Sequence, residues 1–340
     1  MSKVKLQVAL DFLDLDRAMA VARQAVAGGA DYLEAGTPLI KSEGLAAVRA
    51  LRQAFGAHTI IADMKTMDAG KIEAEAAVKA GAGVMTVCAA ADRGTIREAV
   101  ETGRQYGLTI AVDLMGLADP VAFAAQSSEL GVGWLDVHCP IDAQMQGADP
   151  LELLRKVRAA TGLTLAVAGG INSATAALAA AAGADVVIVG GAITKAQDPQ
   201  KATADIRRAL DSHQAVPTEL FTRASQANLR QMLQKVRTSN ISDGSHRQPC
   251  LAGIRTLWQG AFAAGPAVTV QTFPGDWSKP VQAIDAAQPG DVIVVDAAGA
   301  TPAVWGELAT ESARNKQLAG LVVNGAVRDS AEIRALKLPV

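Results

Sequence analysis

The chain has 340 residues, of which 50% are hydrophobic, and it carries a formal net charge of −2. This length suffices for two domains, and the near-neutral charge without a long basic cluster argues against a nucleic-acid or membrane partner. Cys88, Cys139 and Cys250 lie far apart and form no CxxC pair. We therefore expect free thiols and, with no secretion leader in view, a cytoplasmic location.

Short apolar runs rich in β-branched residues recur about every 25 residues through the first 200 positions, with Ala-, Leu- and charge-rich stretches between them. Eight such runs are VKLQVAL before Asp11, DYL before Glu34, HTIIA before Asp63, GVMTV before Cys88, LTIAV before Asp113, GWLDV before His138, LTLAVA before Gly169 and DVVIV before Gly190. Strand alternating with helix predicts an α/β fold, a closed (β/α)8 TIM barrel over residues 1–211, in preference to an open doubly wound sheet. Glycines in GA[DG] sequences are expected to end the helices that return to strands.

The pattern ends after the helical segment DPQKATADIRRAL, and we predict a linker at 212–219. Residues 220–340 are predicted to form a second, C-terminally incomplete α/β domain. It would contain a helical stretch to Val236, a polar segment TSNISDGSHRQP, strands in VIVVDAAG and GLVVNGAVRD, and LKLPV as the start of another strand. The apolar stretch ATAALAAAAGADVVIVGGAI is interpreted as a barrel helix and strand, because Gly183 and Asp185 interrupt it.

Acidic side chains gather at the predicted strand ends. Asp63 to Asp68, DMKTMD, sets two carboxylates and the Lys65 ammonium within six residues, and Asp11 and Glu34 follow neighbouring strands. Catalytic groups of such barrels lie at the carboxyl ends of the strands, so these acids are expected to meet around a hard cation, which suits magnesium. Such an ion would stabilise a sugar enediolate, while Lys65 would hold an oxyanion or move a proton. For any single acid, an ordinary solvated loop charge is the competing interpretation.

Histidine provides a candidate base at the same rim. His138 ends the sixth predicted strand, where a neutral imidazole could remove a proton next to a carbonyl, although a lone histidine is more often structural. His58, His213 and His246 are interpreted as structural or solvated. Asp113 is interpreted as a cap of the following turn and not as a ligand.

Paired glycines follow the seventh and eighth predicted strands, at Gly169-Gly170 and at Gly190-Gly191-Ala192. Barrels often bind phosphate with backbone N–H groups at these two positions, and glycine allows a close approach. A phosphorylated small molecule is therefore the expected substrate.

Residues 4 to about 210 resemble the orotidine 5′-monophosphate decarboxylase suprafamily and, within it, the 3-hexulose-6-phosphate synthases. The matching segments are ALD, EAGTPLIKSEG, ADMKTMDAGK, VDLMG, VHCPIDAQMQG, AGGI and VGGAITKAQDP. The resemblance implies a lyase: a magnesium-dependent aldol reaction, with manganese as a substitute metal, that joins formaldehyde to D-ribulose 5-phosphate through an enediolate and gives 3-hexulose 6-phosphate.

The resemblance also implies residue roles. Glu34 and Asp63 would ligate the metal with Asp11 close by, Lys65 would stabilise the enediolate, and His138 would transfer protons. The two glycine pairs would hold the phosphate. Barrels of this family pair, and Asp68 would reach into the site of the partner, so a homodimer is expected.

The nearest competing activity is that of 3-keto-L-gulonate-6-phosphate decarboxylase, which forms a similar enediolate by losing carbon dioxide. Enzymes with that activity have an arginine directly after this histidine, whereas this chain has Cys139. The resemblance therefore favours the synthase.

Residues from about 218 to 340 resemble the family of ribonuclease-activity regulator A and the 4-hydroxy-4-methyl-2-oxoglutarate aldolases. The matching segments are GPAVTV, FPGDW, PGDVIVVDA, WGELAT and LVVNGAVRDSAEIRALKLPV. The resemblance to the aldolases implies that the Arg-Asp pair, here Arg328 and Asp329, would bind substrate and metal. The turn that contains Gly306 and Leu308 would hold a carboxylate. The alternative of another class is a non-catalytic regulatory or scaffold protein that acts through this domain.

Overall fold

The computed structural model describes residues 3–140, 143, 149–218 and 229–340. These divide into two compact units, Met1–Ser225 and Gln226–Val340, and each is described by itself. The described part of the predicted linker, residues 212–218, belongs to the first unit. There the Ser173 hydroxyl donates to the carbonyl of Val216, and Val216 N donates to the carbonyl of Ser173.

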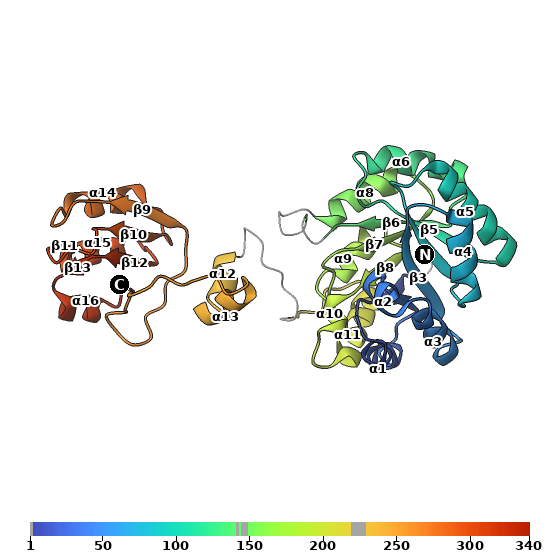
Figure 1. Ribbon diagram of the computed structural model, residues 1–340, viewed down its shortest axis with the longest axis horizontal. Helices are drawn as coiled ribbons and strands as arrows, with labels where there is room; N and C mark the ends of the chain where they lie inside the picture. The colour runs from blue at the N-terminus through green and yellow to red at the C-terminus, as the bar shows by residue number, and fades with distance from the viewer. Residues whose placement is uncertain (1–2, 141–142, 144–148, 219–228) are drawn as a thin grey trace. The chain divides into compact units, whose positions relative to one another are not determined.

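Eight parallel strands close the first unit into a barrel (Figure 1). They are β1 (Lys5–Leu10), β2 (Tyr32–Ala35), β3 (Thr59–Thr66), β4 (Val84–Cys88), β5 (Thr109–Asp113), β6 (Trp134–His138), β7 (Thr164–Ala168) and β8 (Val186–Val189). Each strand pairs with its neighbour in sequence, and β8 pairs with β1. The predicted TIM barrel is confirmed, and His138 ends its strand as predicted. Asp113 is likewise the last residue of β5, whereas Glu34 and Asp63 lie within β2 and β3.

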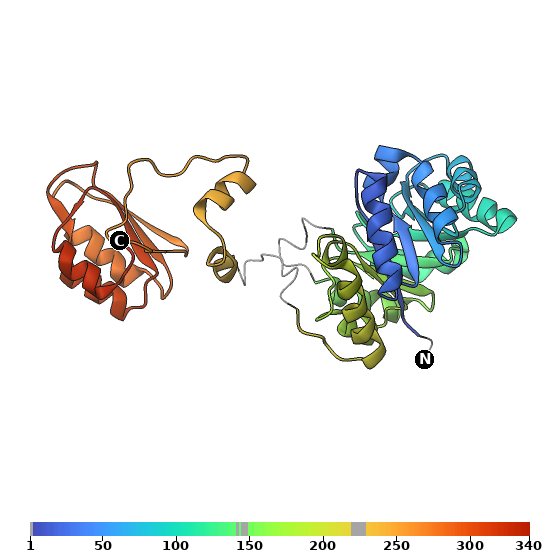
Figure 2. The ribbon, with the colours of Figure 1, turned by 90° about the horizontal axis from the view of Figure 1, so that it is seen from below.

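Helices cover the outside of the barrel, as α1, in blue, shows in Figure 2. They are α1 (Leu15–Ala27), α2 (Thr37–Glu43), α3 (Ala46–Ala54), α4 (Gly70–Lys79), α5 (Arg93–Tyr106), α6 (Pro120–Gln126), the 3-10 helix η1 (Ser127–Leu130), α8 (Pro150–Ala160), α9 (Ala176–Ala181), α10 (Gly191–Thr194) and α11 (Pro199–Ser212). Three of them begin with an Asp-Pro pair, in which the aspartate caps backbone N–H groups and proline occupies the first turn.

An arginine side chain packs against each of the three predicted GA[DG] returns and against a fourth return of different sequence, Gly131-Val132-Gly133. Arg207, Arg52, Arg104 and Arg158, from every second barrel helix, lie against Gly29, Gly81, Gly131 and Gly183 respectively, and all four glycines have positive φ. In two of these returns the arginine also donates a hydrogen bond to an aspartate of the return. Asp31 accepts hydrogen bonds from Leu6 N and Arg207, and Asp185 accepts them from Leu165 N and Arg158, which ties each return to the preceding strand.

The second unit contains α12 (Leu229–Leu233), α13 (Thr238–Gly244), β9 (Ala267–Gln271), α14 (Ser278–Ala286), β10 (Val292–Asp296), β11 (Ala303–Trp305), α15 (Glu307–Asn315), β12 (Gly320–Asn324), β13 (Ala326–Val327) and α16 (Ser330–Leu336). Its parallel strands form a three-stranded sheet in the order β12-β10-β9 and a pair β11-β13. A core around Ile293, Val295, Trp305 and Ile333 supports them. The unit therefore has the predicted α/β character.

The sequence interpretation of this unit missed one helix, and one of its predictions was wrong. The polar segment after Val236 contains helix α13, which buries none of its residues and so shows no apolar periodicity. LKLPV does not begin a strand, because α16 extends to Leu336 and the last residues are irregular. The carbonyls of Pro339 and Val340 nevertheless accept hydrogen bonds from Leu321 and Leu257.

No helix in the described part of the chain is long and apolar enough to cross a membrane. No disulfide joins the three cysteines, as predicted, and Cys88 and Cys139 are buried whereas Cys250 is exposed.

Candidate active site

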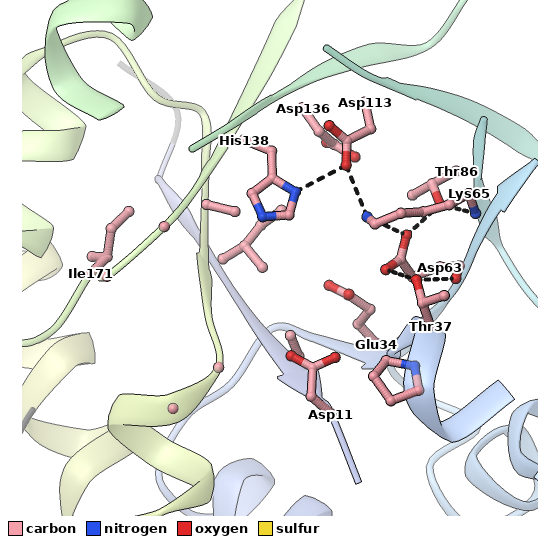
Figure 3. A pocket seen from close by; sticks show the side chains of 18 of the residues that line it. Asp11, Glu34, Thr37, Asp63, Lys65, Thr86, Asp113, Asp136, His138 and Ile171 are labelled. Carbon is pink, nitrogen blue, oxygen red and sulfur yellow. Dashed lines mark hydrogen bonds and ion pairs between the residues drawn. The ribbon is translucent and has the colours of Figure 1, made fainter. Parts of the chain in front are cut away.

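A cavity of about 420 Å³ opens at the carboxyl ends of the barrel strands. It brings together acids, one lysine and one histidine from several strands of the barrel, which Figure 3 shows facing a common space. The lining residues are Ala9, Asp11, Glu34, Thr37, Pro38, Asp63, Lys65, Thr86, Asp113, Asp136, His138, Ala168, Gly169, Gly170, Ile171, Ile188, Gly190, Gly191 and Ala192. The strand-end acids of the sequence prediction thus line one cavity, while Asp68 does not.

A chain of polar contacts crosses one side of the cavity (Figure 3). Lys65 Nζ lies 3.1 Å from Asp63 Oδ1 and 2.8 Å from Asp113 Oδ2. The same Asp113 oxygen lies 3.0 Å from His138 Nδ1. Asp113 therefore joins the lysine to the histidine, and Nε2 is the ring nitrogen that it leaves for other chemistry.

The predicted turn cap by Asp113 is confirmed, but the residue also has a second role. Its Oδ1 does accept a hydrogen bond from Met115 N, but its Oδ2 forms the centre of the lysine–histidine network, and the residue is only 2% exposed. Burial alone would raise the pKa of Asp113, but the hydrogen bond with His138 and the Lys65 ammonium outweigh burial and lower that pKa to about 2. Asp113 is therefore ionised at neutral pH.

Asp63 is buried and held from three directions. Thr37 Oγ1 donates to its Oδ2 at 2.6 Å, Thr86 Oγ1 donates to its Oδ1 at 2.6 Å, and Lys65 binds Oδ1. The β3 ladder is irregular between Ala62 and Thr66, and Lys65 has a φ of 45°. Such a bulge with a left-handed non-glycine residue costs free energy and is typical of functional sites.

Glu34 and Asp11 add negative charge beside Asp63. Glu34 is 6% exposed and accepts a hydrogen bond from Gln7 Nε2 at 2.6 Å. Burial raises the pKa of Glu34, and the charges of Asp63 and Asp11 raise it further. Burial and Asp63 likewise raise the pKa of Asp11. Three carboxyls thus face a shortage of positive charge, and a bound cation would relieve it.

The described residues contain no group of three His, Cys, Asp or Glu side chains arranged to hold one metal ion. The prediction that three acids surround the ion is therefore not supported by the described residues. Two oxygen donors, Glu34 and Asp63, suit magnesium, which usually keeps several waters and binds one or two carboxylates together with substrate oxygens. Buried hard donors with excess negative charge fit such an ion.

Asp136 is a cavity residue that the sequence interpretation missed. It lies two residues before His138 on β6, is 5% exposed, and pairs in register with Asp113 of β5. Burial, followed by the charges of Asp113 and Asp63, raises the pKa of Asp136 to about 8. The alternation of Asp136 with His138 on one strand face was the signal that could have identified it.

Glycines line the opposite side of the cavity. Gly169 and Gly170 have φ values of 125° and 68°, which only glycine adopts easily, and Gly190, Gly191 and Ala192 complete this wall. Gly36, which sequence reasoning missed, has a steric role, because an added Cβ would lie 2.2 Å from Asp11 Oδ1. Asp68 is exposed and accepts a hydrogen bond from Ala69 N.

The residues predicted for a second site also meet. Gly306, Leu308 and Arg328 line a separate cavity of about 300 Å³ in the second unit. Asp329 lies beside it, where its Oδ2 accepts a hydrogen bond from Glu307 N at 3.1 Å and lies 3.5 Å from Arg328 Nε.

Comparison with known proteins distinguishes the two units. Residues 4–206 match the orotidine 5′-phosphate decarboxylase/HUMPS family, and residues 238–340 match the aldolase/RraA family. The chain is 39% identical over 207 residues to 3-hexulose-6-phosphate synthase of Mycobacterium gastri, covering 61% of this chain and 100% of that protein. It is 41% identical over 201 residues to the synthase of Methylomonas aminofaciens, covering 59% of this chain and 96% of that protein.

A solved structure of 3-keto-L-gulonate-6-phosphate decarboxylase from Vibrio cholerae is also similar. It superposes with a TM-score of 0.57 at 31% identity, and the match covers 64% of this chain and all of that one. Both activities suggested by the sequence motifs are therefore represented among the relatives.

Proposed function

The chain belongs to the orotidine 5′-phosphate decarboxylase/HUMPS family and is an enzyme of the lyase class. On that premise, we propose that its barrel condenses formaldehyde with D-ribulose 5-phosphate to give 3-hexulose 6-phosphate. The observation that carries the proposal is the buried Asp63–Lys65–Asp113–His138 network beside Glu34 and Asp11. Its relatives named as synthases are 39% and 41% identical across the whole barrel.

The network can make and hold an enediolate. His138 Nε2 would take a proton from the carbon next to the sugar carbonyl, since Asp113 occupies Nδ1 and orients the ring. Asp63 and Asp113 together raise the pKa of Lys65 against the opposing effect of burial. Lys65 is therefore a fixed positive charge for the oxyanion that forms.

Glu34 and Asp63 would hold magnesium in this site. Bound there, the ion would supply Lewis-acid polarisation of the sugar oxygens. The glycine wall of Gly169, Gly170, Gly190 and Gly191 would receive the phosphate, with backbone N–H groups as donors.

The test compares two reactions in the same preparation. We expect magnesium-dependent consumption of formaldehyde with ribulose 5-phosphate, and loss of that activity with a chelator. Carbon dioxide release from 3-keto-L-gulonate 6-phosphate is the second reaction, favoured by the decarboxylase relative. If the second reaction is much faster, the chain is a decarboxylase.

No arginine lies among the described residues that line the cavity, and Cys139 follows His138, which supports the synthase.

We further propose that two barrels pair and that Asp68 completes the site of the partner. Asp68 is exposed and lies outside its own cavity. The exposed apolar side chains of Met67 and Ile72 flank it in sequence, as an interface would require.

Two other expectations from the sequence stay predictions. They are the cytoplasmic location and the division into a barrel at 1–211, a linker at 212–219 and a second domain at 220–340.

A further inference from the structure

The middle of β6 places a second titratable side chain inside the cavity. Side chains two apart on a strand share a face, so Trp134, Asp136 and His138 all project into the barrel. Asp136 lies one step deeper than His138 and lines the same cavity. Alternate strands build the layers of such a barrel, so Asp136 of β6 belongs with the inward residues of the other even strands.

One oxygen of the Asp136 carboxyl lacks a hydrogen-bond partner in the described part of the protein. Its Oδ1 is fully buried without a hydrogen bond, and no ion pair involves the residue. The nearby Trp134 indole N–H attracts the carboxyl, but it also lacks a partner of hydrogen-bond geometry. A buried carboxyl without a compensating partner is stable only when it is neutral. Asp136 therefore carries a proton that it can donate into the cavity.

The charged groups around Asp136 raise its pKa, with the single exception of Lys65. Asp113 on β5 and Asp63 on β3 are negative, and Asp11 on β1 and Glu34 on β2 add carboxyls to the same cavity. Lys65 is the opposing cation, and Asp63 and Asp113 already bind it. Strands β4, β7 and β8 contribute Thr86, Ala168 and Ile188, which are uncharged, and His138 is engaged by Asp113.

The two register partners Asp113 and Asp136 are thus driven in opposite directions. The pKa of Asp113 is lowered to about 2 by His138 and Lys65, against burial, and that of Asp136 is raised to about 8 by burial and by Asp113. Neighbouring groups whose environments separate their pKa values in this way commonly divide the acid and base roles of a reaction.

We propose that Asp136 is the general acid of the condensation, which protonates the oxygen of the incoming aldehyde as the new carbon–carbon bond forms. The assignment rests on the proposed function. His138 first breaks the C–H bond and keeps the proton on Nε2. The enediolate carbon then attacks the aldehyde carbon, the C=O π bond breaks, and the Asp136 O–H proton moves to that oxygen. After release, the proton on His138 returns to the Asp136 carboxylate through solvent, so one turnover neither consumes nor releases a proton.

The test separates the two proton transfers. Without formaldehyde, His138 alone should exchange the C1 proton of ribulose 5-phosphate with deuterium from D2O, which NMR follows. Asp136→Asn keeps the size and neutrality of the side chain but has no transferable proton. We expect its condensation kcat to fall about 100-fold or more, because general acids contribute 10²–10⁴. Exchange should stay within about threefold of wild type, and Asp136→Glu should regain part of the condensation.

Asp198→Asn is the matched control, because Asp198 caps α11 on the outside of the barrel and asparagine caps equally well. Both of its rates should equal those of the wild type. Undiminished condensation in Asp136→Asn, or equal loss of condensation and exchange, would overturn the assignment. A wild type that neither exchanges nor condenses would refute the proposed function, and this assignment with it.

If Asp136→Asn does not fold, the pH dependence of the wild type decides. Condensation should decline as the pH rises and Asp136 loses its proton, whereas exchange should lack that decline. Identical profiles for the two reactions would overturn the assignment.

Discussion

Replacing Asp136 by asparagine should make the barrel more stable at neutral pH while it removes activity. Folding holds the Asp136 carboxyl in its protonated form, since its pKa is raised from 3.8 to about 8. The unfolded chain releases that proton above its ordinary pKa. The unfolded state then binds fewer protons than the folded state, so the stability of the wild type falls as the pH rises between these two values. Asparagine does not titrate and escapes this loss.

The size of the effect follows from the shift. Each pH unit between the two pKa values costs the wild type about 1.4 kcal/mol. Near pH 4 the two proteins should have equal stability, and near pH 7 the variant should be more stable by up to about 4 kcal/mol. Between about pH 6 and pH 8 the difference should grow by roughly 2 kcal/mol.

Buried thiols allow the barrel to be measured within the full chain. Cys88 and Cys139 are buried in the first unit, whereas Cys250 is exposed in the second. After equilibration in urea with a chelator, a short pulse of a methanethiosulfonate reagent should label the first two only in unfolded barrels, and Cys250 at every urea concentration. A stability difference that does not change with pH, or one that favours the wild type, would refute the reasoning.

Three further outcomes are expected. Asp63→Ala should lower turnover at least about 100-fold, because it removes the carboxylate that holds Lys65, while circular dichroism shows a folded barrel; an unfolded variant would make the residue structural. Asp68→Ala should be weakly active alone, and mixing it with Asp63→Ala should restore about a quarter of wild-type activity if two-fold dimers share sites; no recovery would place Asp68 in its own subunit. Gly183→Ala should lower the free energy of unfolding by about 1–3 kcal/mol, since its φ is 103° and its Cβ would lie 2.7 Å from Arg158; Gly162→Ala, which meets nothing within 4 Å, is the control in the same urea titration.

The barrel could be predicted from sequence because its signal is repetitive. Each apolar run, helix and glycine return repeats the same local pattern, and parallel strands bring their ends to one edge regardless of the details. That placed Asp11, Glu34, Asp63, Lys65 and His138 in one cavity. The helix α13 escaped prediction because it buries none of its side chains and has no apolar stripe.

The network itself could not be derived in the same way. Asp113 meets Lys65 across 48 residues of sequence and His138 across 25, and these contacts depend on strand register, which a local pattern does not specify. Asp136 stands inside the apolar run WLDVH, where a single acid gives no indication of its protonation. Its chemistry follows from the carboxyls that neighbouring strands bring beside it.

The arginine–glycine contacts at the helix-to-strand returns have a consequence for circular permutation of the barrel. Arg207 of α11, which follows the last strand, packs against Gly29 in the return before β2, so this contact spans the junction where β8 pairs with β1. Arg158 of α8 packs against Gly183 before β8 in the same way. The junction between β8 and β1 is therefore stabilised by the same kind of contact as a position within the chain. New termini opened at a return that no arginine covers should therefore leave a circular permutant of the barrel in which all four arginine–glycine contacts are intact.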